Sequence, residues 1–231
     1  MIKAFALVLL WVHVASAGGI PGLAIGTDLD KQPVGTWSEY TLADGAHQQT
    51  VRWSLVAHDR DGSTLEVSMT DATISPGKRA PVVERITIAA SAPKALDAAN
   101  AKVVGSAALQ IGTADPISSP PGALHRLAAN ANEGTSSITV KAGTYVVTHR
   151  REVTAQGTFD YWMSDRAGPL GIVKLTMTRT GAKAGGVYTV ELASTGTTAK
   201  PMIVKKPIRV DRRSIANLRA TLATQRPLEH E

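Results

Sequence analysis

The sequence predicts a mainly β protein, a curved antiparallel sheet or half-barrel with one or two short helices. Two observations favour this fold class. Apolar and polar residues alternate in repeated runs, which is the pattern of half-buried strands. Many connections between these runs are too short for a parallel crossover, so we expect antiparallel strands. The length of 231 residues suits one all-β domain, which we place at residues 18–199.

The first half of this domain contains the clearest alternation. In residues 51–57 and 65–69, apolar side chains occupy every second position. Between them, the segment from Asp59 to Gly62 ends in an Asp-Gly pair, which predicts a hairpin turn. Further strands are expected at residues 36–42, 82–89 and 103–111.

The second half predicts a single antiparallel meander, because each run is followed by a short turn. Glycine-containing segments such as 141–143 and 181–186 separate the runs. The expected strands are residues 136–140, 144–153, 158–164, 171–179 and 187–194.

Three stretches interrupt the alternation. Residues 93–103 are rich in alanine and predict a short helix. Residues 112–134 form a long proline-containing segment, which is typical of a lid, a binding loop or a disordered insert, and 123–128 suit a helical turn. Residues 211–224 predict a C-terminal helix, with Asp211 as its N-cap and apolar residues recurring on one face.

The N-terminus has the features of a secretory signal peptide at residues 1–17. Lys3 precedes an apolar run, and Ala15 and Ala17 supply a small-residue cleavage site. We therefore expect an exported protein, periplasmic or extracellular, that is soluble after cleavage before Gly18. The alternative is a buried or interfacial N-terminal helix. The chain has no cysteine, which excludes disulfides and a cysteine-linked lipid anchor.

The positive charge is concentrated in residues 200–231, a basic C-terminal linker and helix. The whole chain carries a net charge of +6, yet basic and acidic residues balance in 18–199. Because a nucleic-acid-binding domain is expected to have a basic face on its body, we expect no nucleic-acid partner. The tail instead suits an acidic protein or an anionic membrane surface. Its candidate partner-binding residues are Lys205, Lys206, Arg209, Arg212 and Arg213.

No strong catalytic, cofactor or metal motif is present, so we expect a non-enzymatic protein without cofactor or metal. The acidic residues around Gly62 depart from the spacing of a calcium loop and suit the hairpin turn better. A dyad of His149 with Asp160 on a neighbouring strand is conceivable from the alternation, but it depends on the strand register.

Residues 158–164 carry three aromatic side chains on one expected strand. Phe159, Tyr161 and Met163 face one side, whereas Trp162 faces the other. One interpretation is a central strand with both faces covered. The other is that Phe159, Tyr161 and Met163 line a hydrophobic cavity or groove, and these three are the candidate ligand-binding residues.

The hairpin formed by 160–164 and 168–175 resembles one found in half-barrel bacterial envelope proteins. These comprise the lipoprotein-carrier (Lol-type) family and related periplasmic domains of unknown function. Residues 34–40 are similar to their first strand. The resemblance covers about a fifth of the chain. It implies a curved antiparallel sheet that wraps a helix or an apolar cavity, and it transfers no functional residue.

Two functions follow as expectations. The first is binding of a lipid or other hydrophobic small molecule, apolar or amphipathic, on the concave face of the sheet. The alternative is a structural or interaction component of a bacterial envelope assembly that uses the basic tail. A ligand carrier needs an apolar cavity of roughly 300–1,000 Å³, whereas an assembly component needs a filled core and an exposed patch.

Overall fold

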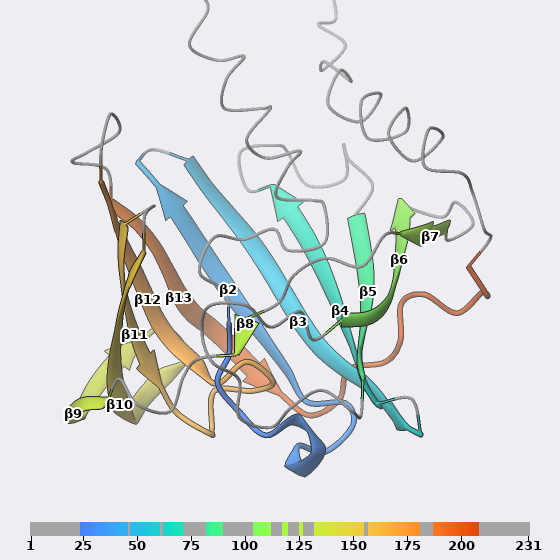
Figure 1. Ribbon diagram of the computed structural model, residues 1–231, viewed down its shortest axis with the longest axis horizontal. Coiled ribbons are helices and arrows are strands. Elements are labelled where there is room, and N and C mark those ends of the chain that lie inside the picture. Colours follow the sequence, from blue (N-terminus) through green and yellow to red (C-terminus); the bar gives the residue numbers. More distant parts are fainter. Residues whose placement is uncertain are drawn as a thin grey trace, which may run out of the picture.

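A computed structural model of the chain shows one large, strongly curled sheet (Figure 1). The structure describes residues 24–45, 47–60, 62–71, 82–89, 104–111, 117–119, 125–126, 132–154, 157–180 and 187–207.

These residues contain thirteen strands and one short 3-10 helix, η1. In chain order the elements are β1 (Ala24–Ile25), η1 (Leu29–Lys31), β2 (Trp37–Asp44), β3 (His47–Asp59), β4 (Gly62–Asp71), β5 (Val82–Ala89), β6 (Val104–Ile111), β7 (Ile117–Ser119), β8 (His125–Arg126), β9 (Asn132–Val140), β10 (Gly143–Thr154), β11 (Gly157–Met163), β12 (Ile172–Arg179) and β13 (Val187–Gly196). Among them, no helix is long and apolar enough to cross a membrane.

Eleven strands form one antiparallel sheet in the order β7-β6-β5-β4-β3-β2-β13-β12-β11-β10-β9. Two meanders, β2 to β7 and β9 to β13, are joined edge to edge where β13 pairs with β2. The predicted fold class and the predicted meander of the second half are therefore confirmed. The hairpin turn between β3 and β4 is also confirmed, and the backbone N–H of Gly62 donates to the Asp59 carboxylate at 3.1 Å.

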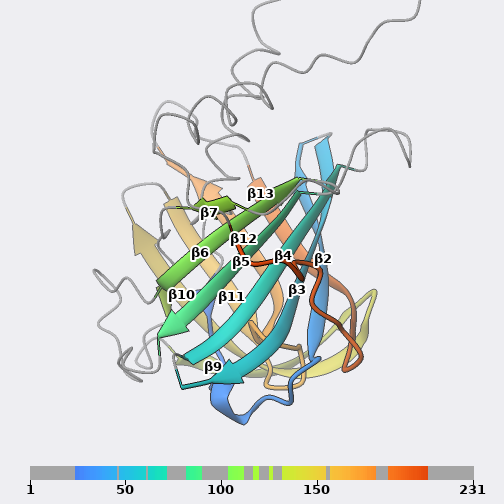
Figure 2. The ribbon, with the colours of Figure 1, turned by 90° about the vertical axis from the view of Figure 1, so that its right-hand side faces the viewer.

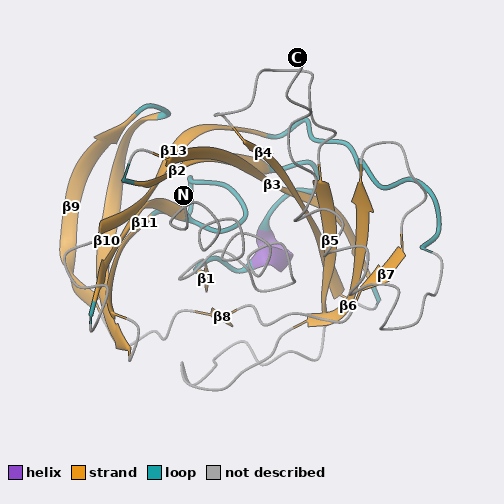
Figure 3. Cartoon of the chain, turned by 90° about the horizontal axis from the view of Figure 1, so that it is seen from above, coloured by secondary structure: helices purple, strands orange, loops and turns teal. Residues whose placement is uncertain are grey.

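The sheet curls without closing. Seen from above, it bends around a central space that contains β1 and η1, and the described strands β7 and β9 at its two ends do not pair (Figure 3). Figure 2 shows that the segment following β13 then crosses the outside of the curl, over β3 to β5. The sheet thus has an inner face, which surrounds β1 and η1, and an outer face.

The core lies on the inner face because the alternating apolar positions of most strands point there. Ile25 of β1 and Leu29 of η1 belong to the same buried cluster as the strand residues, which places that cluster inside the curl. Its largest members with almost no exposed surface include Tyr40, Leu42, Leu55, Leu65, Tyr161, Leu175 and Leu192.

The segment that carries η1 is fixed to the loop between β11 and β12. Gly26 donates its N–H to the carbonyl of Leu170 at 2.9 Å, and the Thr27 hydroxyl donates to the carbonyl of Pro169 at 2.5 Å. The loop can turn tightly because Gly168 and Gly171 adopt φ values of 80° and 71°, which favour glycine. A Cβ atom at Gly168 would also lie 2.9 Å from the Cβ of Ser38. This loop therefore holds η1 within one end of the curl.

The helical turn suggested at 123–128 is wrong for the two residues of it that the structure describes. His125 and Arg126 form β8 and pair in parallel with Ala24 and Ile25 of β1. Backbone pairing with a distant segment has overridden the local helical pattern. The signal peptide, the helix expected at 93–103 and the C-terminal helix at 211–224 lie outside the described residues.

Candidate functional site: the inner face of the sheet

The inner face is a continuous apolar band that runs across several strands. One row of directly opposed residues illustrates it. From β11 to β3 the row contains Tyr161, Leu175, Val190, Leu42 and Gln49. The first four are buried and belong to the core cluster, so the row is apolar until it reaches the Gln49 amide.

All three residues expected to bind a ligand lie on this inner face. Phe159, Tyr161 and Met163 are buried, and the rings of Phe159 and Tyr161 stack with centroids 6.3 Å apart. Burial raises the pKa of the Tyr161 hydroxyl, so this side chain stays neutral at physiological pH. The structure shows the three residues as part of the core, and their contact with a ligand stays a prediction.

Several polar atoms are buried on the inner face without a hydrogen bond. Gln49 Oε1, Trp53 Nε1 and Tyr188 Oη have no hydrogen-bond partner in the described part of the chain. Buried polar groups in native proteins are almost always paired with protein or ordered water. These atoms are therefore able to bind a polar group that enters the curl.

A charged pair lies beside Tyr188 at the end of the strands. Arg179 donates to both carboxylate oxygens of Asp44, at 3.0 and 2.6 Å. Hydrogen bonding to Asp44 raises the pKa of Arg179, and burial raises the pKa of Tyr188. Asp44 and Tyr188 are directly opposed on β2 and β13. The apolar band therefore ends in a fixed polar rim.

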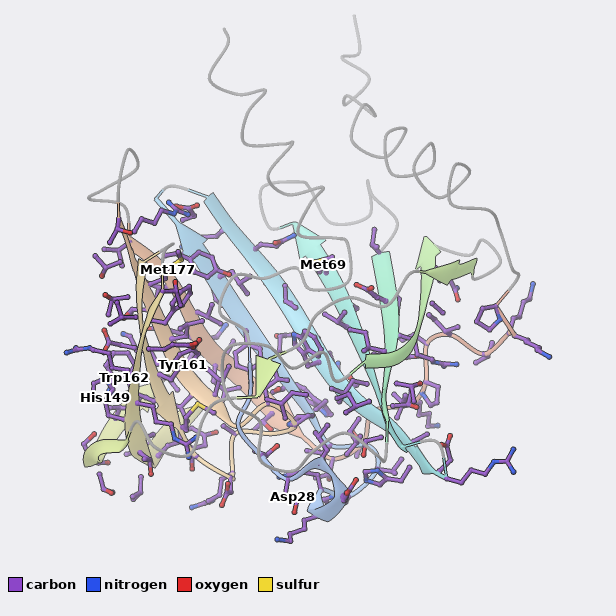
Figure 4. All side chains as sticks on the ribbon, viewed as in Figure 1. Asp28, Met69, His149, Tyr161, Trp162 and Met177 are labelled. Carbon is purple, nitrogen blue, oxygen red and sulfur yellow. The ribbon has the colours of Figure 1, made fainter. Side chains whose placement is uncertain are left out.

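Two methionines lie near this rim on opposite walls of the curl. Met177 of β12 is buried, whereas Met69 of β4 is partly buried and packs against the core cluster. Figure 4 shows both toward the same end of the molecule, opposite Asp28 and η1. Flexible thioether side chains adapt readily to irregular apolar surfaces.

The conceivable His149–Asp160 contact exists, on the outer face of β10 and β11. His149 Nε2 lies 2.8 Å from Asp160 Oδ1, and Arg151 Nε donates to the same oxygen at 2.8 Å. The imidazole also stacks on Trp162, with centroids 5.0 Å apart (Figure 4). Because Trp162 lies opposite His149 and Asp160 opposite Arg151, these contacts hold β10 against β11. A catalytic role for the pair stays a conjecture from the sequence.

The part of the basic tail that the structure describes lies on the outer face. We call residues 197–207 the strap. Lys205 and Lys206 are exposed on it, whereas Arg209, Arg212 and Arg213 lie outside the described residues. The sequence predicts a linker here, and the structure shows that Ile203 is buried against Val83 and Ala108.

A buried carboxylate fixes the strap, and sequence reasoning missed it. Glu66 of β4 accepts the backbone N–H groups of Met202 at 2.6 Å and of Ile203 at 3.1 Å. Arg85 pairs with the same carboxylate and also donates to the carbonyl of Ile203. The sequence gives little indication that Glu66 is buried, because a glutamate at an outward position of a strand ordinarily faces solvent.

Comparison of the sequence with protein-family models and with curated proteins finds no match. Among the described residues, no three histidine, aspartate or glutamate side chains are grouped as a metal site would require. The residues that could bind a ligand or partner therefore lie on the two faces of the sheet.

Proposed function

We propose that the protein binds an apolar or amphipathic ligand, such as a lipid, on the inner face of the curled sheet, without catalysing a reaction. The observation that carries this proposal is the combination of a continuous apolar band with a few buried polar atoms that have no hydrogen-bond partner within the described ranges. Ligand sites for small molecules commonly have this composition, mostly apolar walls with a small number of polar groups that fix orientation.

The geometry also suggests how an amphipathic ligand would be oriented. Its chain would lie along the band near Tyr161 and Leu175. Its polar end would lie toward the rim, where Tyr188 Oη and Gln49 Oε1 have no hydrogen-bond partner among the described residues and Arg179 is paired with Asp44. Among the described strands, β7 and β9 do not pair, which is compatible with entry from the side of the curl. The sequence resemblance to half-barrel carriers agrees with this proposal.

The test is a titration of the full chain with the fluorescent fatty acid dansyl-undecanoate. We expect saturable binding that unlabelled dodecanoate displaces. Replacing the hydroxyl in Tyr188→Phe should weaken binding about 3- to 10-fold, because one hydrogen bond contributes about 0.5–1.5 kcal/mol. Gln49→Leu should weaken binding similarly.

The stability of the free protein supplies the control. Because the Tyr188 hydroxyl has no partner in the described part of the chain, Tyr188→Phe should leave the free energy of unfolding unchanged or slightly higher. Tyr145→Phe is the matched variant, since this buried tyrosine lies on β10, away from the rim. Absence of saturable binding, or equal affinities for all of these variants, would contradict the proposal.

A further inference from the structure

The outer face carries a groove that the proposed function does not use. It lies between the strap and strands β2 to β4, and its volume is about 420 Å³. Charged residues from both sides line it, Glu39 and Arg52 from the sheet and Lys200 from the strap. The Glu66 contacts and the buried Ile203 hold the strap in place, so the groove is formed before any ligand binds.

The charges in this groove do not neutralise one another. Glu39 and Arg52 are directly opposed on β2 and β3, yet the two side chains form no ion pair. The Arg52 guanidinium instead lies over the Trp37 ring, 3.9 Å from its centroid, while the Ser194 hydroxyl donates to Glu39 at 3.3 Å. In the described part of the chain, Arg52 has no hydrogen-bond acceptor.

Stacking on Trp37 orients the guanidinium and leaves its donors available. A guanidinium that lies over an aromatic face keeps its N–H groups at its own edge, in the guanidinium plane, where they can bind an oxyanion in a bidentate manner. Lys200 on the strap is exposed and supplies a second cation to the same groove. The groove therefore suits an anionic group, with two cations against one carboxylate.

The other residues that line the groove favour a ligand with hydrogen-bonding groups in addition to its negative charge. Thr50, Ser54, Ser68 and Thr198 place hydroxyl groups in the groove, and each can donate or accept a hydrogen bond. The Ser194 hydroxyl donates to Oε1 of Glu39, so the second carboxylate oxygen can accept a hydrogen bond from a ligand. A fully deprotonated anion such as sulfate offers no donor, whereas an anion that also carries hydroxyl groups offers several.

We propose that this outer groove binds a phosphate ester that carries hydroxyl groups. The phosphate oxygens accept from Arg52 and Lys200, and a ligand hydroxyl donates to Glu39. Such a group occurs both in small soluble phosphates and in the headgroup of an anionic lipid. Met202 lines the groove and is 46% exposed, and Val204, two residues further along the strap, is 83% exposed, so a lipid surface has apolar side chains of the strap to contact.

Two experiments on the full chain test this site. The first is calorimetric titration with glycerol 1-phosphate, compared with glycerol and with sulfate. The second is co-sedimentation with phosphatidylglycerol vesicles, compared with phosphatidylcholine vesicles. We expect glycerol 1-phosphate to bind more tightly than both comparison compounds. Binding to phosphatidylglycerol vesicles would identify a lipid source, and binding to the soluble ester alone would identify a soluble one.

Single substitutions test whether the ligand binds in the outer groove. Arg52→Gln should weaken binding at least tenfold, and Lys200→Gln should weaken it to a smaller extent. Arg166→Gln removes an exposed arginine from the β11–β12 loop and should leave the affinity unchanged. A thermal melt establishes that each variant is folded, and Ser68→Ala offers a second, milder change within the groove.

Three results would overturn the inference. The first is the absence of binding to both the soluble ester and the vesicles. The second is binding that Arg52→Gln and Ser68→Ala leave unchanged. The third is equal affinity for sulfate, which has no hydroxyl group to donate to Glu39. None of these results depends on dansyl-undecanoate, so the inner-face proposal is tested separately.

Discussion

The two faces of the sheet are built by the same strands but have opposite characters. Tyr161 and Trp162 are adjacent in β11, yet Tyr161 is 1% exposed inside the curl whereas Trp162 is partly exposed and stacks on His149. The inner face carries a continuous apolar band that ends in a polar rim, whereas the outer face carries several ion pairs and a groove between the strap and the sheet. Alternation along each strand therefore determines which side chains lie on each face. Segments distant in the sequence, such as the strap and η1, determine which parts of each face are covered.

The largest expected effect is in the core of the inner face. Tyr161→Ala should lower the free energy of unfolding by about 3–5 kcal/mol, because truncation of a buried aromatic residue leaves a cavity. Trp162→Ala should cost only about 1–2 kcal/mol, since its side chain is partly exposed and retains one packed face. Denaturant unfolding of both variants measures the difference. Equal losses would mean that both faces of β11 are covered to the same extent.

A smaller effect is expected where the strap meets the outer face. Ile203→Ala should cost about 2–4 kcal/mol, because Ile203 is 1% exposed against Val83 and Ala108. Val204→Ala is the matched control, since Val204 is 83% exposed and its truncation should change stability by less than about 0.5 kcal/mol. Similar melting temperatures for the two variants would show that the strap does not pack on the sheet in solution.

Alkaline pH should lower the free energy of unfolding, because three buried tyrosines lie on the inner face. Burial raises the pKa values of Tyr40, Tyr161 and Tyr188 above the ordinary value of 10.0, so these hydroxyls stay protonated in the folded state. In the unfolded chain they ionise above about pH 10. The contribution of the buried, neutral tyrosines to the free energy of unfolding is therefore complete below about pH 10. It falls as the pH rises above about 10, by up to about 1.4 kcal/mol per pH unit for each tyrosine.

Denaturant midpoints at pH 9 and pH 11 measure this loss. Tyr188→Phe should reduce the pH dependence, since the substitution removes one ionising group. A wild-type midpoint that stays constant over this range would contradict the burial of the three hydroxyl groups.

The smallest effect is expected for the ion pairs of the outer face. Arg151 is 48% exposed, so Arg151→Gln should change stability by no more than about 0.5 kcal/mol. The Asp160 carboxylate keeps its contact with His149 in this variant. A loss of 2 kcal/mol or more in denaturant unfolding would show that the outer face contributes to stability as strongly as the inner face.

The sequence was sufficient for the longer strands because alternation is a local signal, but it did not predict the short strands β1, β7 and β8. Phe159, Tyr161 and Met163 could be assigned to one face by counting positions, and the structure agrees. The strand β8 could not be foreseen, since its pairing with β1 depends on a segment a hundred residues away in the chain. The Glu66 anchor and the stacking of Arg52 on Trp37 likewise depend on the register between strands and on the path of the strap.

Binding of an apolar ligand to the inner face is tested most directly by the methionine methyl signals. Met69, Met163 and Met177 lie on the inner face, whereas Met202 lies beside the outer groove. In NMR spectra of protein labelled with methyl-13C methionine, with signals assigned by single substitutions to leucine, titration with dodecanoate should shift Met69 and Met177 and leave Met202 in place. Shifts confined to Met202, or no shift at a saturating concentration, would contradict ligand binding within the curl.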